Sequence, residues 1–137
     1  MSMIDNIIRQ IADILIDFKT DKQRTEWSSG KLSQNIINIV LILAFVSYLI
    51  FQKKIMITEI FRTQEENNKI YGDTKHISTH TYYRAVDLRT SIYTANQASF
   101  LSAIANCFQY DPKRPAKNTA LYGDKLHLNH IHLQVLS

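Results

Sequence analysis

The first eighteen residues repeat apolar positions with a helical period. One face carries Ile4, Ile7, Ile8, Ile11, Leu15 and Phe18, and the other carries Asp5, Asn6, Arg9, Asp13 and Asp17. This pattern predicts an amphipathic helix whose apolar face packs against the same domain, another chain or a bilayer interface. We treat residues 1–30 as an N-terminal amphipathic helical segment, which Ser28, Ser29 and Gly30 separate from the next helix.

Residues 32–52 form an apolar run without a charged side chain, flanked by Lys31 and by Lys53 and Lys54. The run is long enough to span a membrane, and it equally suits a helix buried on all sides inside the domain. We favour the buried helix, because the strand-like run Ile55–Phe61 follows at once and leaves no linker between a bilayer and a folded domain. Membrane association through residues 32–52 stays open as the alternative, and lysines on both flanks give no orientation signal.

The rest of the chain alternates short strand-like and helical patterns. The strands that we expect are Ile55–Phe61, Ala85–Leu88 and His130–Leu136. Thr94–Tyr110 repeats apolar residues at helical spacing, and Thr63 with Glu66 has the spacing of a capping box that starts a short helix. These patterns indicate an α+β domain over residues 31–137, with N-terminal helices followed by a small antiparallel sheet flanked by helices.

Composition narrows the classes of function. The chain has 137 residues, which suits one domain, and its net charge of +4 suits ordinary solubility or contact with an anionic surface. We expect no nucleic-acid partner, because no long basic run is interleaved with aromatic residues. Cys107 is the only cysteine, which excludes an internal disulfide and a cysteine-rich zinc site. We expect no secretory signal peptide at the N-terminus.

The candidate chemistry lies in two short segments. On the last expected strand, His130, His132 and Gln134 share one face, because side chains alternate along a strand. His80 and Asp87 lie at the two ends of a loop-to-strand segment. Imidazole nitrogen and carboxylate oxygen are good zinc ligands, and three protein ligands leave a fourth position open, as in catalytic zinc sites. The pattern indicates metal-assisted hydrolysis rather than a structural zinc site.

The same segments carry a joint motif. Ser78-x-His80 is followed by Arg84-Ala85-x-Asp87, and His130-x-His132-Leu133-Gln134 comes later. This combination resembles the zinc D-alanyl-D-alanine carboxypeptidase family, which has the Hedgehog-type metallopeptidase fold and cuts peptide stems of bacterial cell walls. Further stretches look like those of small phage and bacterial members: Ile57–Thr63, Asp87–Thr90 and Tyr110–Pro115. The resemblance covers roughly residues 55–135.

The resemblance implies a role for each matching residue. His80, Asp87 and His132 would bind Zn²⁺ as the cofactor, and His130 would lie beside the metal and interact with its bound water. Arg62 would point toward the scissile carbonyl or the developing oxyanion. Ser78 would stabilise its loop or contact the substrate, and Gln134 would contribute to substrate binding.

The chain departs from the family pattern at two positions. Tyr83 stands where the family usually has glycine, so it is strained if the backbone there has a positive φ. Asn129 stands where many relatives place the glutamate that acts as general base. Our candidates for the general base are therefore His130, then His127, then Asp124.

The leading expectation is a zinc metallopeptidase that hydrolyses peptide bonds of bacterial peptidoglycan at the cell wall or in the periplasm, as a D,D-carboxypeptidase or an endopeptidase. A zinc-binding module with weak catalysis that interacts with the wall is the second expectation. A membrane-associated structural protein, with residues 32–52 spanning the bilayer, is the third.

Overall fold

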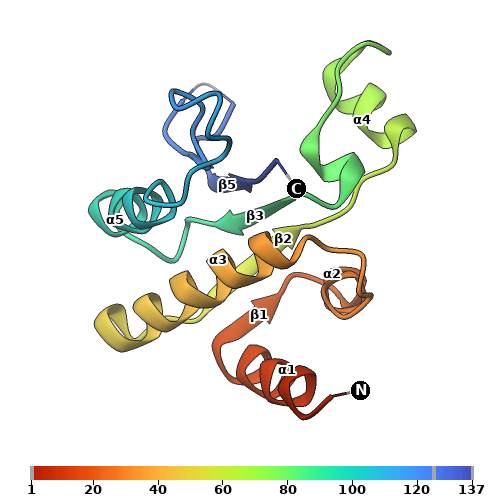
Figure 1. Ribbon diagram of the computed structural model, residues 1–137. Coiled ribbons are helices and arrows are strands. Elements are labelled where there is room, and N and C mark those ends of the chain that lie inside the picture. Colours follow the sequence, from red (N-terminus) through yellow and green to blue (C-terminus); the bar gives the residue numbers. More distant parts are fainter. Residues whose placement is uncertain (1, 125, 137) are drawn as a thin grey trace.

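A computed structural model describes residues 2–124 and 126–136 (Figure 1). The α-helices are α1 (Met3–Leu15), α2 (Asp21–Trp27), α3 (Gln34–Val46), α4 (Gln64–Tyr71) and α5 (Ala95–Ala105). A π-helical turn, η1 (Ser47–Phe51), extends α3, and a 3-10 turn, η2 (Thr79–Tyr82), precedes the third strand. The strands are β1 (Ile16–Phe18), β2 (Ile55–Glu59), β3 (Ala85–Arg89), β4 (Ala120–Leu121) and β5 (His130–Gln134).

The strands form one five-stranded sheet in the order β1-β2-β3-β5-β4. β1 pairs with β2 in parallel, and the other neighbouring strands pair antiparallel. Helix α3 lies across one face of the sheet, with α1 and α5 beside it (Figure 1). The expected combination of helices with one sheet is therefore confirmed, but the sheet is mixed rather than purely antiparallel.

The parallel strand β1 comes from the segment expected to be helical through residue 18. Helix α1 ends at Leu15, and residues 16–18 continue as an extended strand that pairs with residues 55–57. Both a helical period and a strand-like alternation fit Ile16-Asp17-Phe18. Pairing with the edge of the sheet, at β2, therefore determines that these residues are extended. Ile16 is buried in the same core as α3 and the central strands, which joins the N-terminal segment to the sheet.

The apolar helix α3 is buried along one face, not on all sides. Its inner residues Ile36, Ile39, Val40, Leu43 and Ala44 belong to the core. Several large residues on the other side and at the η1 end are exposed, among them Phe45, Leu49 and Ile50. Residues 34–51 have a mean hydropathy of 2.1 and are one-third buried, so length and composition alone would allow this helix to cross a membrane.

Local signals placed several elements correctly. Thr63 caps α4 with a reciprocal bond to Glu66, as the spacing predicted, and Thr94 with Gln97 forms the same kind of box at the start of α5. Strands β2, β3 and β5 fall within one or two residues of the expected bounds. Helix α5 ends at Ala105, earlier than the expected Tyr110, and the chain from there to β5 is irregular except for the short strand β4.

The core face of β5 gives a direct test of this packing. Ile131 is fully buried in the core that α3 shares with the sheet, so Ile131→Ala removes apolar contacts and leaves a cavity. We expect the free energy of unfolding, measured by urea titration, to fall by about 2–5 kcal/mol. The control Leu128→Ala, at a side chain that is 68% exposed, should change it by less than about 0.5 kcal/mol. Equal losses in both variants would contradict the assigned core face.

Candidate metal centre

The pairing of β3 with β5 brings together two parts of the predicted site. Asp87 lies directly opposite His132 in the antiparallel register, so both side chains project from the same face of the sheet. Their neighbours Val86, Leu88 and Leu133 point into the core on the other face. The alternation that we inferred for the last strand is thus observed, and the polar face lies on the side of the sheet away from α3.

The third member of the cluster, His80, is held by the turn η2. The hydroxyl of Ser78 accepts a hydrogen bond from the backbone N–H of His80 and caps this turn. His80 Nδ1 lies 2.8 Å from the carbonyl oxygen of Ile60, and a carbonyl only accepts, so Nδ1 carries the proton. In the neutral ring, Nε2 then has a free lone pair, and it lies 3.1 Å from Asp87 Oδ1.

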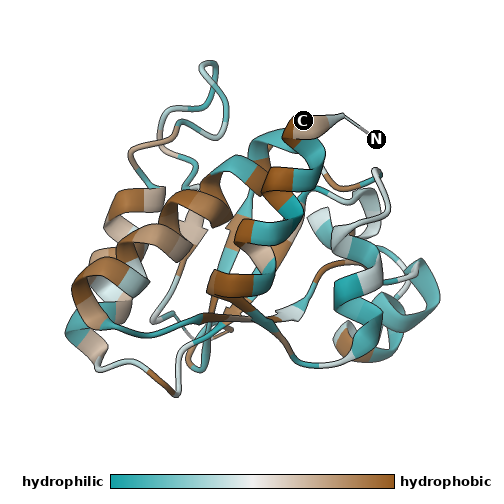
Figure 2. Cartoon of the chain, turned by 90° about the horizontal axis from the view of Figure 1, so that it is seen from below, coloured by the Kyte–Doolittle hydropathy of each residue, from teal (hydrophilic) through white to brown (hydrophobic). Residues whose placement is uncertain are grey.

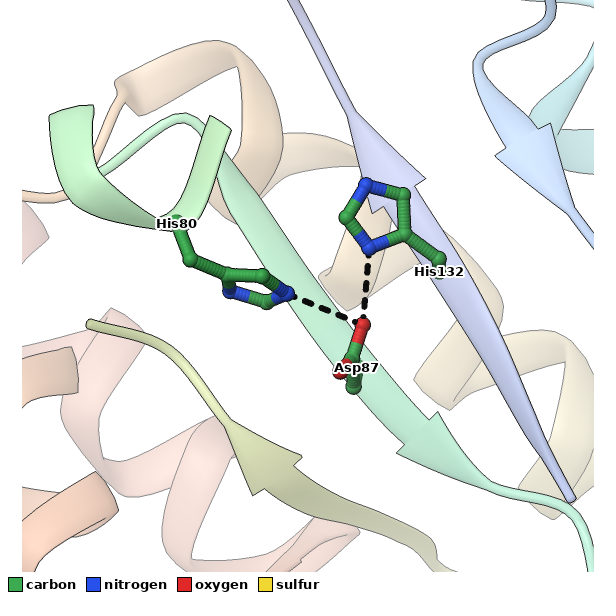
Figure 3. Close-up of side chains that lie close together, drawn as sticks. All are labelled: His80, Asp87 and His132. Carbon is green, nitrogen blue, oxygen red and sulfur yellow. Dashed lines mark hydrogen bonds and ion pairs between the residues drawn. The ribbon is translucent and has the colours of Figure 1, made fainter. Parts of the chain in front are cut away.

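Figure 3 shows the resulting arrangement, in which the two imidazole rings approach one carboxylate. His132 Nδ1 lies 2.9 Å from the same Asp87 Oδ1, and all the donor atoms lie within 4.8 Å of one another. The three side chains are buried. Such a group of two nitrogens and a carboxylate can hold a metal ion.

The charge balance also favours a cation at this point. Within the described residues, the ion-pair partners of Asp87 are the histidines 80, 130 and 132, and no lysine or arginine pairs with it. A neutral His80 would direct a lone pair at a carboxylate oxygen, which is repulsive unless a proton or a metal ion lies between them. The donor set therefore fits a bound cation.

The surroundings shift two pKa values. Burial alone would raise the pKa of Asp87, but the charge of His80 and hydrogen bonds from His132 and His80 outweigh it and hold that pKa well below its usual range. Burial lowers the pKa of His130, although the Asp87 carboxylate acts in the opposite direction. The carboxylate is therefore charged, and burial favours neutral His130.

A cleft of about 470 Å³ opens onto the cluster. With the exception of Asp124, the residues that the sequence nominated for the site line it: His80, Asp87, His132, Arg62, Ser78, His127, His130 and Gln134. Their side chains come from the segment after β2, from η2 and the residue before it, from β3 and β5, and from the loop before β5. The chain thus gathers them from segments far apart in sequence.

Arg62 lines the cleft although it is a charged residue that is almost fully buried. Its side chain is only 7% exposed, and one terminal nitrogen donates to Asn67 Oδ1 at 3.3 Å. Its Nε is buried and has no hydrogen-bond partner among the described residues. A buried donor without a hydrogen-bond partner is costly. Arg62 therefore places a cationic side chain in the wall of the cleft.

The general-base candidates are oriented differently. His127 Nδ1 lies 2.6 Å from Asp124 Oδ1, so Asp124 holds this ring beside the rings of His130 and His132. His130 Nδ1 bonds the side-chain oxygen of Asn129 at 3.0 Å, and its Nε2 lies 3.8 Å from Asp87 Oδ2. Asp124 is not among the residues that line the cleft, and its side chain contacts His127, which does line it.

Ser78 and Gln134 already have protein partners. Ser78 caps η2, which agrees with the expected stabilisation of its loop. Gln134 Nε2 donates to the carbonyl oxygen of Asn118 at 2.9 Å and so fastens the loop before β4 to β5. Both side chains border the cleft, but their observed bonds are structural.

Sequence reasoning missed three supporting residues. The carbonyl of Ile60 orients His80, Thr79 Oγ1 lies 3.3 Å from His132 Nε2, and buried Asn67 bonds both Arg62 and the carbonyl of His76. Thr79 had a signal, since it lies between Ser78 and His80 in the motif. A backbone carbonyl and a helical asparagine carry no pattern in the sequence that would have found them.

Tyr83 has the backbone conformation that its place in the motif suggested. Its φ of 56° and ψ of 37° lie in the left-handed region, where a side chain costs about 1–2 kcal/mol. Its ring stacks on Phe61 at 4.4 Å between ring centroids, with the planes 7° apart. This stacking offsets part of the strain.

We expect Tyr83→Gly to be about 1 kcal/mol more stable than Tyr83→Ala, because both lose the stacking on Phe61 and only glycine removes the backbone strain. Thermal unfolding of the two variants measures the difference. The same pair of substitutions at Tyr82, which precedes the left-handed residue, should favour alanine. If Tyr83→Ala proved the more stable of the two variants at position 83, the positive φ would not be required.

Comparison of the chain with protein-family models, with curated proteins and with solved structures found no match. The support for a function therefore comes from the geometry of the cluster and from the motif in the sequence.

We expect Zn²⁺ to raise the melting temperature of the protein and a chelator to reverse the effect. An ion that binds only the folded state stabilises it by about 2.7 kcal/mol when the free ion concentration is 100 times the Kd. Asp87→Asn and His132→Ala should abolish the shift, because the first removes the negative charge of the carboxylate and the second removes the imidazole nitrogen. His76→Ala is the control, since His76 stacks on Tyr71 outside the cluster. A zinc shift that survives both ligand variants would place the ion elsewhere.

Proposed function

We propose that this protein is a zinc-dependent peptidase that hydrolyses peptide bonds of bacterial peptidoglycan. The observation that carries the proposal is the buried group of His80, Asp87 and His132, which borders the same cleft as the guanidinium-bearing side chain of Arg62. A metal-binding group and an oxyanion-binding group in one cleft are the two parts that hydrolysis of an amide needs.

The donor set favours zinc over harder cations. Zn²⁺ binds imidazole nitrogen and carboxylate oxygen, whereas Mg²⁺ and Ca²⁺ prefer oxygen ligands alone. Structural zinc sites usually have four protein ligands, and catalytic sites have three. The described residues offer three donors in this cluster, beside a cleft that water and substrate can enter. Zinc bound there would supply a water of lowered pKa and would polarise a carbonyl.

The residues around the metal group have separate tasks in this proposal. The guanidinium of Arg62 binds the oxygen on which negative charge develops. Nε2 of His130 accepts the proton of the attacking water and passes it to the leaving amine, because this nitrogen lies close to the cluster, 3.8 Å from Asp87 Oδ2. His127, held by Asp124, is the second candidate for that task.

The substrate class rests on the motif. The segments 78–87 and 130–134 resemble those of zinc D-alanyl-D-alanine carboxypeptidases, and both segments border the cleft. The volume of the cleft, about 470 Å³, is within the range of small-molecule sites and suits a short peptide. The substrate would therefore be a peptidoglycan peptide, cut in the manner of a carboxypeptidase or an endopeptidase.

The central experiment incubates zinc-loaded protein with purified peptidoglycan and measures the amines released, with and without a chelator. We expect release that stops with the chelator and returns with Zn²⁺. Release that persists after Asp87→Asn would contradict a metal mechanism, since this variant removes the charged ligand. Tight stoichiometric zinc without release would instead support the zinc-binding wall module, which the replacement of the usual glutamate by Asn129 favours.

We expect Arg62→Met to lower kcat about 10²–10³-fold while the protein still binds one equivalent of zinc, because the substitution removes an oxyanion donor and no metal ligand. Activity assays and metal analysis of the same sample measure both quantities. Arg9→Met, on the exposed side of α1, is the matched control and should leave kcat unchanged. Full turnover by the Arg62 variant would exclude this role.

A further inference from the structure

The C-terminal end of helix α3 carries a large exposed apolar surface. Figure 2 shows α3 as a largely hydrophobic ribbon on the outside of the molecule. We define the apolar tip as Phe45, Tyr48, Leu49 and Ile50 with Phe100 of α5, whose side chains are 44%, 46%, 73%, 59% and 44% exposed. Contiguous exposed surfaces of this kind mark interaction sites.

The tip is held rigidly to the domain. Phe51 packs edge-on against Tyr93 and Phe100, and Ser47 Oγ donates to the carbonyl of Lys53 at 2.7 Å. Gln52 ends η1 in the left-handed conformation and turns the chain directly into β2. The apolar side chains therefore project from a fixed turn and do not belong to a segment that can fold back over the core.

The segments that carry the tip contain basic residues and no acidic ones. The chain has no acidic residue from residue 27 to 58 or from residue 88 to 110, the two stretches that contain α3, η1 and α5. In the first stretch, Lys53 and Lys54 follow η1 directly. In the second, Arg89 at the end of β3 lies beside the start of β2, because the two strands pair antiparallel. Lys53 bonds Gln97 on α5, and Lys54 forms an ion pair with Asp17 at 3.6 Å.

The rest of the helix cannot leave the domain to span a bilayer without exposing its core face. Ile36, Val40, Leu43 and Ala44 are fully buried against the sheet. Helix α1 also exposes apolar side chains, Met3 and Ile4, but Asp5 and Asp13 lie on the same helix. The tip, in contrast, combines exposed apolar residues with flanking stretches whose only charged residues are basic.

We propose that the apolar tip inserts into the surface of an anionic lipid bilayer and that the neighbouring lysines contact the headgroups. Leu49 and Ile50 enter the boundary between headgroups and acyl chains, Tyr48 lies at the headgroup level, and Lys53 faces the anionic lipids. The negative surface potential attracts a basic border, whereas a neutral bilayer offers the apolar contribution alone. This binding is independent of the cleft and of the proposed catalysis.

The test is co-sedimentation of the full chain with vesicles of equal parts phosphatidylglycerol and phosphatidylcholine, and with pure phosphatidylcholine. We expect binding to the anionic vesicles that weakens with salt. Leu49→Gln should lower the partition coefficient about tenfold, since it removes one inserted aliphatic side chain. Lys53→Gln should lower it about fivefold. Leu128→Gln, at a leucine that is 68% exposed in the loop before β5, should leave it unchanged.

Several outcomes would overturn the proposal. The first is that the protein does not bind anionic vesicles. The second is that the Leu49→Gln variant binds them as tightly as the parent protein and has the same melting temperature. Self-association in solution that Leu49→Gln abolishes, without vesicle binding, would assign the tip to a second copy of the chain. The His132→Ala variant should bind vesicles as the parent does, so a failure of the metal site and a failure of lipid binding are distinguished.

Discussion

The Asp87 carboxylate is the point on which the site depends. A buried carboxylate is stable only when positive charge or hydrogen bonds compensate its lost hydration. Here two imidazoles from separate segments supply the observed contacts, 3.1 Å from His80 Nε2 and 2.9 Å from His132 Nδ1 to the same oxygen. The carboxylate can keep this position only if β3, β5 and η2 are all in place, so the site and the centre of the sheet form together.

The register of β3 and β5 is the constraint that keeps the polar and apolar faces apart. A slip by one residue would move Asp87 to the core side and Leu88 into the cleft. Burial of Ile131 and Leu133 against α3 opposes such a slip. The hydrophobic core therefore selects the alignment that places Asp87 opposite His132, and the face of α3 that packs on the sheet contributes to the geometry of a site on the opposite side.

Much of the central fold could be predicted because its signals are local. Alternation along residues 130–134 and the capping box at Thr63 each fix a conformation within a few residues. The family resemblance implied that His80, Asp87 and His132 meet, and they do. The strand β1 was missed, because three residues at the end of an amphipathic helix read equally well as its last turn. The partners of Arg62 and His80 were missed because an amide on α4 and a backbone carbonyl reach them only in the folded chain.

Helix α3 illustrates why composition alone could not choose between a core helix and a membrane helix. Its inner face meets the sheet, while Phe45, Leu49 and other large side chains remain exposed. One apolar sequence therefore serves two surfaces, and hydropathy averaged over the helix does not separate them. The separation becomes visible only when burial is assigned residue by residue. In this chain it divides a buried core face, which packs on the strands that carry the candidate metal site, from an exposed tip bordered by basic residues.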